Sequence, residues 1–82
     1  MSVYQILLFA TLRDLAQTER VRLELPQPAT VGTLRRALAQ RFPSLAPYTE
    51  SAIVAVNHTF TTDDTPIAPN DEIAVFPPVS GG

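Results

Sequence analysis

The chain has 82 residues, of which 45% are hydrophobic and 17% charged, and its formal net charge is −2. This length fits one small domain, and the absence of a basic cluster argues against nucleic-acid binding as the main activity. The chain contains no cysteine, which excludes disulfides, thiolate metal sites and a cysteine nucleophile.

Two amphipathic strands are predicted in the first part of the chain. Residues 3–10 alternate, and the polar Gln5 indicates that the odd positions face outward. This apolar run has no basic flank and is far shorter than the ~20 residues of a membrane helix, so we expect a cytoplasmic protein without a membrane partner. Residues 11–18 form a polar connection with a short helical turn near 12–16. Residues 19–25 alternate more cleanly, with Val21, Leu23 and Leu25 facing inward.

One substantial helix is predicted after two prolines close the second strand. Thr30 is a good N-cap, and apolar residues then recur at helical spacing as far as Phe42. Pro43 disfavours helical geometry at the residue before it and ends the helix there. The opposite, solvated face is expected to carry Arg35, Arg36 and Gln40.

The remaining elements are strands and turns. Residues 44–50 are expected to form a loop, 51–57 an apolar strand at the centre of a covered sheet, and 58–70 a turn-rich segment with a short strand near 59–61. Asn70 suits a turn position with positive φ. In the last strand, 72–76, the inward-facing residues are Ile73 and Val75.

The predicted fold class is α+β, with a mixed sheet of about five strands packed on one main helix. We expect a folded domain over 1–76 and an extended functional tail over 77–82. Pro77 and Pro78 lack ladder donors, so they end the sheet and stiffen the exit. The tail then continues as Val79, Ser80, Gly81 and Gly82, none of which is charged.

The terminal Gly81-Gly82 pair is the strongest functional candidate. Chance alone gives a terminal glycine pair in about one chain in two hundred, so the pair by itself is weak evidence. The diproline before it and the loss of side chains along the tail fit an arm that enters a narrow channel in a partner. Extended, residues 77–82 would reach roughly 20 Å.

Several apolar residues are predicted on the sheet face opposite the helix. Leu7, Phe9 and Phe76 share this face by parity, and Phe60 joins them if the short strand pairs as expected. Exposed apolar side chains gathered on one face indicate a binding patch. Phe76 directly precedes the tail and could anchor it on a partner.

No other residue points to an active site within the chain. His58 is a single histidine in a turn without a second ligand nearby, so we expect no metal site. Asp63-Asp64 and Asp71-Glu72 read as solvated turn residues, Ser80 has no recognisable activating histidine, and no phosphate-binding loop is present. We therefore expect a carrier or binding module that holds no cofactor and has no enzymatic activity on its own.

The closing segment resembles a known family. Val56-Asn57-His58 and the run from Asn70 to Gly82, NDEIAVFPPVSGG, are similar to the small, sulfur-carrier subunit of molybdopterin synthase, as are Ile6 to Ala10 and Arg13-Asp14-Leu15. That family usually has glycine before the Asp-Glu pair, where this chain has Asn70, and often glutamine at the position of His58.

The resemblance implies a ubiquitin-like β-grasp fold and a chemistry centred on Gly82. An E1-like adenylyltransferase would use ATP to activate the Gly82 carboxyl group, which a sulfur donor then converts to a thiocarboxylate. The tail would deliver this sulfur to cyclic pyranopterin monophosphate inside the large subunit of a heterotetrameric synthase.

Three alternatives remain open. A sibling carrier for thiamin, tRNA thiolation or cysteine synthesis would share the fold and the glycine pair. A ubiquitin-like modifier would form amide bonds to lysines of other proteins. An interaction module would use the domain surface and leave the tail inert.

Overall fold

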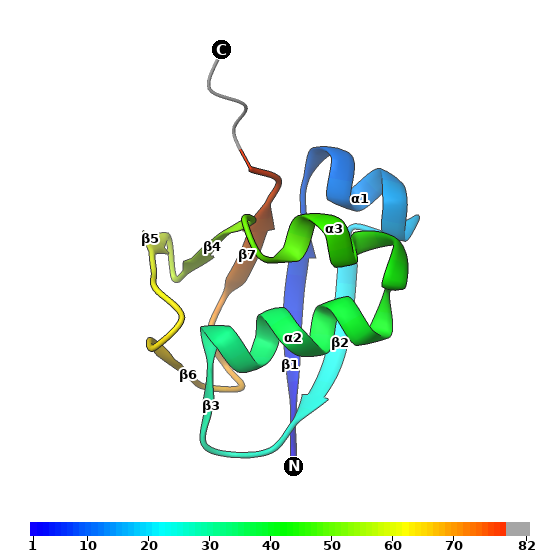
Figure 1. Ribbon diagram of the computed structural model, residues 1–82. Coiled ribbons are helices and arrows are strands. Elements are labelled where there is room, and N and C mark those ends of the chain that lie inside the picture. Colours follow the sequence, from blue (N-terminus) through cyan, green and yellow to red (C-terminus); the bar gives the residue numbers. More distant parts are fainter. Residues whose placement is uncertain (79–82) are drawn as a thin grey trace.

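A computed structural model describes residues 1–78 of the chain (Figure 1). Its elements, in chain order, are β1 (Ser2–Leu8), α1 (Ala10–Ala16), β2 (Arg20–Leu25), β3 (Ala29–Thr30), α2 (Val31–Arg41), η1 (Pro43–Leu45), α3 (Ala46–Thr49), β4 (Ile53–Val56), β5 (Thr59–Phe60), β6 (Pro66–Ile67) and β7 (Ile73–Phe76).

The main sheet has five strands in the order β2-β1-β7-β4-β5. β1 is antiparallel to β2 and parallel to β7, and β7 is antiparallel to β4. The last strand therefore lies at the centre of the sheet, between the first strand and β4. This mixed sheet packs on one side against α2, which confirms the predicted α+β class and β-grasp fold.

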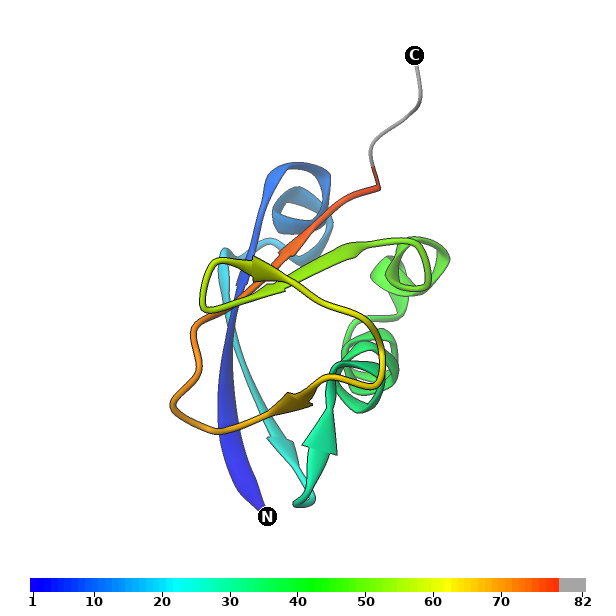
Figure 2. The ribbon, with the colours of Figure 1, turned by 90° about the vertical axis from the view of Figure 1, so that its left-hand side faces the viewer.

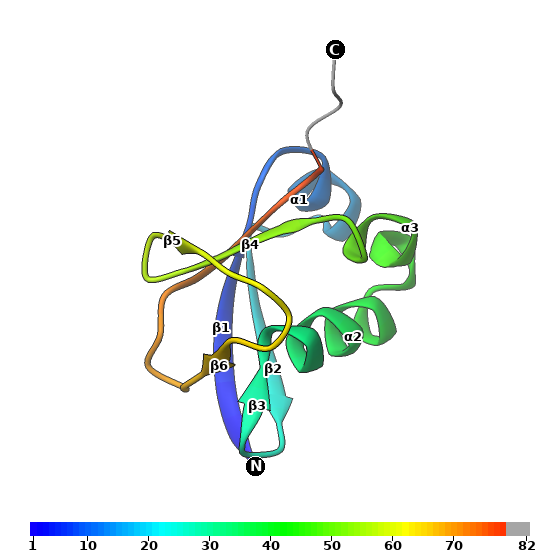
Figure 3. The ribbon, with the colours of Figure 1, turned by 60° about the vertical axis from the view of Figure 1, so that its left-hand side comes forward.

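The hydrophobic core lies between this sheet and the helices, and Figure 3 shows α2 and α3 on one side of the sheet. Even-numbered residues of β1 face this core, as the alternation predicted. The largest fully buried side chains are Tyr4, Ile6, Leu8, Leu12, Leu25, Leu34, Leu38, Leu45 and Ile73, with Val31 and Val75. No helix in residues 1–78 has the length and apolarity needed to cross a membrane.

Helix α2 begins and ends where the sequence predicts. The Thr30 hydroxyl accepts a hydrogen bond from the Thr33 backbone N–H at 3.3 Å, and the Thr33 hydroxyl accepts one from the Thr30 N–H at 3.4 Å. This reciprocal capping satisfies two N–H groups that have no partner within the helix. At the other end, α2 stops at Arg41, two residues before Pro43.

The prediction that Arg35 lies on a solvated face is wrong. Its Nη1 donates hydrogen bonds to the carbonyl oxygens of Thr49 at 2.6 Å and Ala52 at 2.7 Å, with a longer one to Glu50 at 3.3 Å. Its Nε donates to Asp63 Oδ1 at 3.0 Å. The guanidinium group thus joins α2 to the end of α3 and the start of β4, because its planar donors reach several backbone oxygens that would otherwise lack partners.

Residues 44–50 are not a loop: η1 and α3 occupy most of this range. Each of these short helices carries a proline in its first turn, where a missing N–H costs no helical hydrogen bond. β3 and β6, which the sequence pattern does not predict, form a separate two-stranded sheet, visible in Figure 2. Two residues per strand are too few for an alternation pattern.

The expected positive φ at Asn70 is also wrong, because only Ala10, Gln17, Asn57 and His58 have positive φ among the described residues. The turn around Asn70 is closed differently. The Asp71 backbone N–H donates to the Ala68 carbonyl at 3.0 Å, and the Ala68 N–H donates to Asp71 Oδ2 at 2.7 Å. These bonds close the turn without a left-handed residue.

Candidate functional site

Four predicted residues gather on the sheet face that carries no helix among residues 1–78 (Figure 3). In the sheet register, Leu7 pairs with Ala74, Ala74 with Ala55, and Ala55 with Phe60. Residues that pair directly across strands share a face, so this row runs unbroken over β1, β7, β4 and β5. The predicted common face of Leu7, Phe76 and Phe60 is confirmed. We call the set formed by Leu7, Phe9, Ala55, Phe60, Ala74 and Phe76 the apolar patch.

Phe9 and Phe76 form the aromatic end of the apolar patch. Their ring centroids lie 4.6 Å apart with an interplanar angle of 14°, a stacked arrangement. Phe9 reaches this position because its backbone N–H donates to the Val75 carbonyl at 3.2 Å, one residue beyond the end of β1. Ala10, with φ of 51°, then turns the chain into α1. The stack lies where β7 ends and Pro77 begins.

The apolar patch lines a shallow depression of about 360 Å³. Its floor includes Ala55 and Ala74, whose small side chains leave the space between the larger ones. Phe60, on the outermost strand, is 76% exposed. Ala55 is not predictable from the sequence as a member of this face, because a strand that is apolar on both faces shows no alternation to separate them.

The rim of this depression is polar on the side of the β4–β5 hairpin. His58 Nε2 lies 2.6 Å from Glu72 Oε2, and both side chains are largely exposed. His58 shares the two-residue hairpin turn with Asn57, and both have positive φ, as a type I′ turn requires. Among residues 1–78, no group of three or more His, Cys, Asp and Glu side chains could hold a metal ion.

Asn57 attaches this hairpin to the start of β7. Its side-chain Nδ2 donates to Asp71 Oδ1 at 3.0 Å, and its Oδ1 accepts from the Glu72 backbone N–H at 2.9 Å. Its own backbone N–H donates to the Glu72 carbonyl at 2.7 Å. Asn57 thus holds β4, β5 and β7 in the register that forms the apolar patch.

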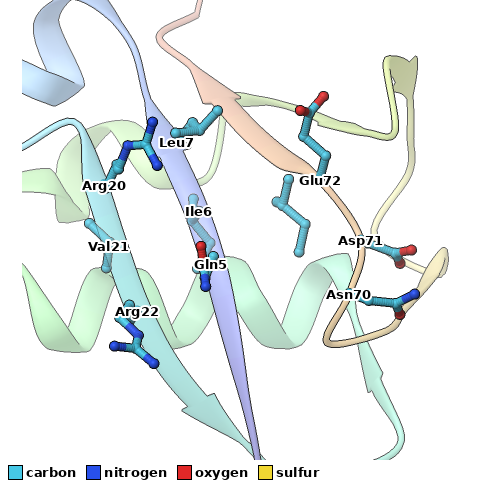
Figure 4. Close-up of a pocket in the computed structure, with 10 residues that line it drawn as sticks. Gln5, Ile6, Leu7, Arg20, Val21, Arg22, Asn70, Asp71 and Glu72 are labelled. Atoms are coloured by element: carbon cyan, nitrogen blue, oxygen red, sulfur yellow. The ribbon is translucent and has the colours of Figure 1, made fainter.

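A second, polar groove of about 510 Å³ lies beside the apolar patch on the same face (Figure 4). Arg20 and Arg22 project from β2 on one side of it, and Asp71 and Glu72 lie on the other. The two acids already have partners, in Asn57 and His58 respectively. Within residues 1–78, Arg20 and Arg22 form no ion pair with an acidic side chain. The basic side of the groove is therefore available to groups outside this part of the chain.

The tail begins at the aromatic end of the apolar patch. Pro77 and Pro78 are half-buried and continue from the centre of the sheet without secondary structure, as the missing ladder donors predict. The other predicted tail residues, Val79, Ser80, Gly81 and Gly82, lie outside the described residues. The structure shows where the tail begins, which is directly after Phe76 at the end of β7.

The chain is similar in sequence to known proteins. The model of the ThiS family matches residues 6–82. The molybdopterin synthase sulfur carrier subunit of Arabidopsis thaliana is 35% identical over 78 residues, covering 95% of this chain and 81% of that protein. The subunit of the same name from Escherichia coli K12 is 36% identical over 80 residues, covering 95% and 98%.

Solved structures agree with this likeness. The crystal structure of Haloferax volcanii small archaeal modifier protein 1 superposes with a TM-score of 0.85 and 29% identity, covering 96% of this chain and all of that one. The shared fold therefore extends over the whole domain, including the strands that carry the apolar patch.

Proposed function

Because the chain belongs to the ThiS family, we propose that it is a sulfur carrier for molybdenum cofactor biosynthesis and acts as the small subunit of a molybdopterin synthase. The observation that carries this proposal is the likeness, at about 35% identity over nearly the whole chain, to proteins named molybdopterin synthase sulfur carrier subunit. The position of the apolar patch, which ends at the residue before the tail, supports it.

The proposed chemistry takes place at the Gly82 carboxyl group. A carboxylate is a poor electrophile, so an E1-like adenylyltransferase first joins it to AMP from ATP and releases pyrophosphate. Sulfide (HS⁻), supplied by a sulfur donor, then attacks the carbonyl carbon, and the bond between this carbon and the AMP oxygen breaks, so that AMP leaves and the thiocarboxylate remains. In this scheme the chain holds no cofactor and supplies the reacting atom, while acid–base groups come from its partners.

Sulfur delivery requires docking on the large subunit. The apolar patch offers apolar area around a stacked aromatic pair, and such clusters supply much of the affinity in protein interfaces. The tail starts at the edge of this patch, so docking would direct residues 77–82 into the partner. Cyclic pyranopterin monophosphate bound there would receive the sulfur.

Intact mass spectrometry of the protein from its native source tests the proposed chemistry. We expect a population heavier by the difference between sulfur and oxygen, with the change confined to the C-terminal peptide. A wholly unmodified population would contradict the proposal.

Deletion of Gly82 tests the same site by function. The variant should lose molybdopterin formation with purified partners, while its circular dichroism and thermal unfolding stay unchanged. Activity that survives the deletion would remove the tail from the mechanism.

A mixing experiment would then identify the pathway. Thiocarboxylated protein is mixed with large subunits of different sulfur pathways, and only the matching subunit should consume the sulfur.

Substitution of Phe76 by Asp tests the docking face. We expect at least tenfold weaker binding to the large subunit, because a charge replaces a stacked ring at the base of the tail. Val3→Asp is the matched control: Val3 lies on the same face of β1, is 38% exposed and is outside the apolar patch. Equal affinities for the two variants would remove Phe76 from the interface.

Protein modification is the second candidate function, favoured by the likeness to the structure of Haloferax volcanii small archaeal modifier protein 1. A modifier would join its C-terminal carboxyl group to amines of other proteins. All six basic residues here are arginine, so the chain offers no lysine as an acceptor for its own copies. Amide-linked conjugates in the native source, at the expense of thiocarboxylate, would favour this function.

A further inference from the structure

The outer edge of β2 has a free hydrogen-bonding segment. β2 is the last strand on one side of the sheet, and among residues 1–78 only its β1 side is paired in the main sheet. The Leu8 N–H donates to the Glu19 carbonyl at 2.8 Å, which fixes which residues bond across the β1–β2 ladder. By alternation, Val21, Leu23 and Leu25 point their backbone groups at β1, and Arg20, Arg22 and Glu24 point theirs outward.

This free segment is short because both of its ends are closed. The Thr18 hydroxyl accepts a hydrogen bond from the Arg20 N–H at 3.3 Å and donates one to the Arg20 carbonyl at 3.0 Å. At the other end, Pro26 occupies the next outward position and has no N–H to offer. The N–H and C=O groups of Arg22 and Glu24 remain, and no hydrogen bond to them from residues 1–78 is present outside the strand ladders.

The side chains on this segment have no ion-pair partner in the part of the chain that the structure describes. Arg22 and Glu24 are exposed, and neither forms an ion pair within residues 1–78. Helix α2 does not close off the edge. An open groove of about 430 Å³ lies between the two elements and is lined by Leu23, Ala37, Gln40 and Arg41 as well as by the two charged residues.

We propose that β2 pairs antiparallel with β2 of a second copy of this chain, around a two-fold axis at Leu23. In this register Arg22 lies opposite Glu24 of the second copy, and Glu24 lies opposite Arg22 of the second copy. The free N–H and C=O groups of Arg22 and Glu24 then find partners, and both cross-strand pairs join opposite charges. The two five-stranded sheets become one continuous sheet.

Neighbouring registers place like charges opposite each other and leave backbone groups of the β2 edge without hydrogen-bond partners. An axis at Arg22 places two Arg22 side chains opposite each other and pairs Glu24 with Arg20, whose backbone groups Thr18 already occupies. An axis at Glu24 places two Glu24 side chains opposite each other and pairs Arg22 with Pro26. The order Arg-Leu-Glu therefore selects one register by charge and by hydrogen bonding together.

The proposed pairing leaves the apolar patch free. The apolar patch lies over β1, β7, β4 and β5, and the tail leaves from β7, so both are away from the β2 edge. Few backbone groups take part, so the association is weak, with a dissociation constant of about 0.1–1 mM.

Sedimentation equilibrium and concentration-dependent amide NMR shifts of the full chain test this pairing. We expect a reversible dimer, with the largest shift changes at the Arg22 and Glu24 amides. Arg22→Glu should weaken it roughly tenfold, because both symmetric pairs become repulsive. Arg22→Glu combined with Glu24→Arg should restore it to within about threefold of the original chain, since opposite charges face each other again.

Two control variants separate this edge from other surfaces. Arg36→Glu changes the net charge equally on an exposed face of α2 and should leave the dimer unchanged, as should Phe60→Asp in the apolar patch. A chain that stays monomeric up to about 3 mM would overturn the proposal. So would a dimer that Phe60→Asp abolishes, a dimer insensitive to Arg22→Glu, or a double variant that does not recover.

Discussion

The two faces of the main sheet are formed by the same strands and differ in how deeply their side chains are buried. On the helix-covered face, Ile6, Ile73 and Val75 are almost completely buried. On the open face, their neighbours Leu7, Ala74 and Phe76 remain partly exposed, with Phe60 beside them. The comparison teaches that alternate residues of one strand can serve different purposes, since one set packs in the core and the next residue along remains on an accessible surface.

Adjacent substitutions in β1 would test this division most strongly. Ile6→Ala should lower the free energy of unfolding by about 2–4 kcal/mol, because it leaves a cavity in the core. Leu7→Ala should lower it by less than about 1 kcal/mol, because the side chain is partly exposed. Urea unfolding measures both changes. Equal losses would show that the open face is as important for stability as the core.

The covered side also depends on one polar residue. Arg35→Met should destabilise the fold by about 2–3 kcal/mol, since the carbonyls of Thr49 and Ala52 lose a charged donor. The ion pair with Asp63 adds little, because that carboxylate is 63% exposed. Arg36→Met, one residue along α2 and exposed, is the control and should change stability by less than about 0.5 kcal/mol. Thermal unfolding with matching midpoints for the two variants would contradict this role of Arg35.

A smaller effect is expected where the hairpin supports the open face. Asn57→Ala should cost about 1–2 kcal/mol, because it removes two side-chain hydrogen bonds and because alanine tolerates the left-handed φ of 52° less well than asparagine does. Asn57→Gly keeps the turn conformation and should cost less. Chemical denaturation of both variants separates the two causes, and a larger loss for glycine would show that the backbone conformation is unimportant.

The smallest effect on stability is expected at the outermost residue of the apolar patch. Phe60→Ser should change the free energy of unfolding by less than about 0.5 kcal/mol, because the ring is largely exposed, yet weaken large-subunit binding at least about fivefold. Tyr48→Ser, exposed on α3 outside the patch, should change neither quantity. Calorimetric titration measures the affinity. Unchanged binding by the Phe60 variant would confine the interface to the Phe9–Phe76 end.

Sequence reasoning succeeded where a pattern repeats over several residues. The alternation in β1 and β2 and the helical spacing after Thr30 identified the covered face, and parity placed Leu7 and Phe76 on the open one. It failed where contacts between residues distant in the sequence determine where a side chain lies. Arg35 is drawn inward by backbone carbonyls that only the fold brings near it, and Ala55 lies in a strand that is apolar on both faces.

The short strands could not be predicted from the sequence for a related reason. β3 and β6 exist because each provides the other's hydrogen bonds, and neither has a local pattern. At Asn70, residue preference suggested a left-handed turn, but the Asp71 carboxylate closes the turn by accepting the Ala68 N–H. The assignment of Gly82 depends on resemblance and chemistry, since residues 79–82 lie outside the described part of the chain.

The central place of β7 has a mechanical consequence. The segment that begins at Pro77 is attached to a strand bonded on both sides, to β1 and to β4, rather than to an edge strand. Tension applied along that segment would be shared between two ladders, one parallel and one antiparallel. An enzyme that draws the end of the chain into a deep channel could therefore pull on it without peeling the last strand from the domain.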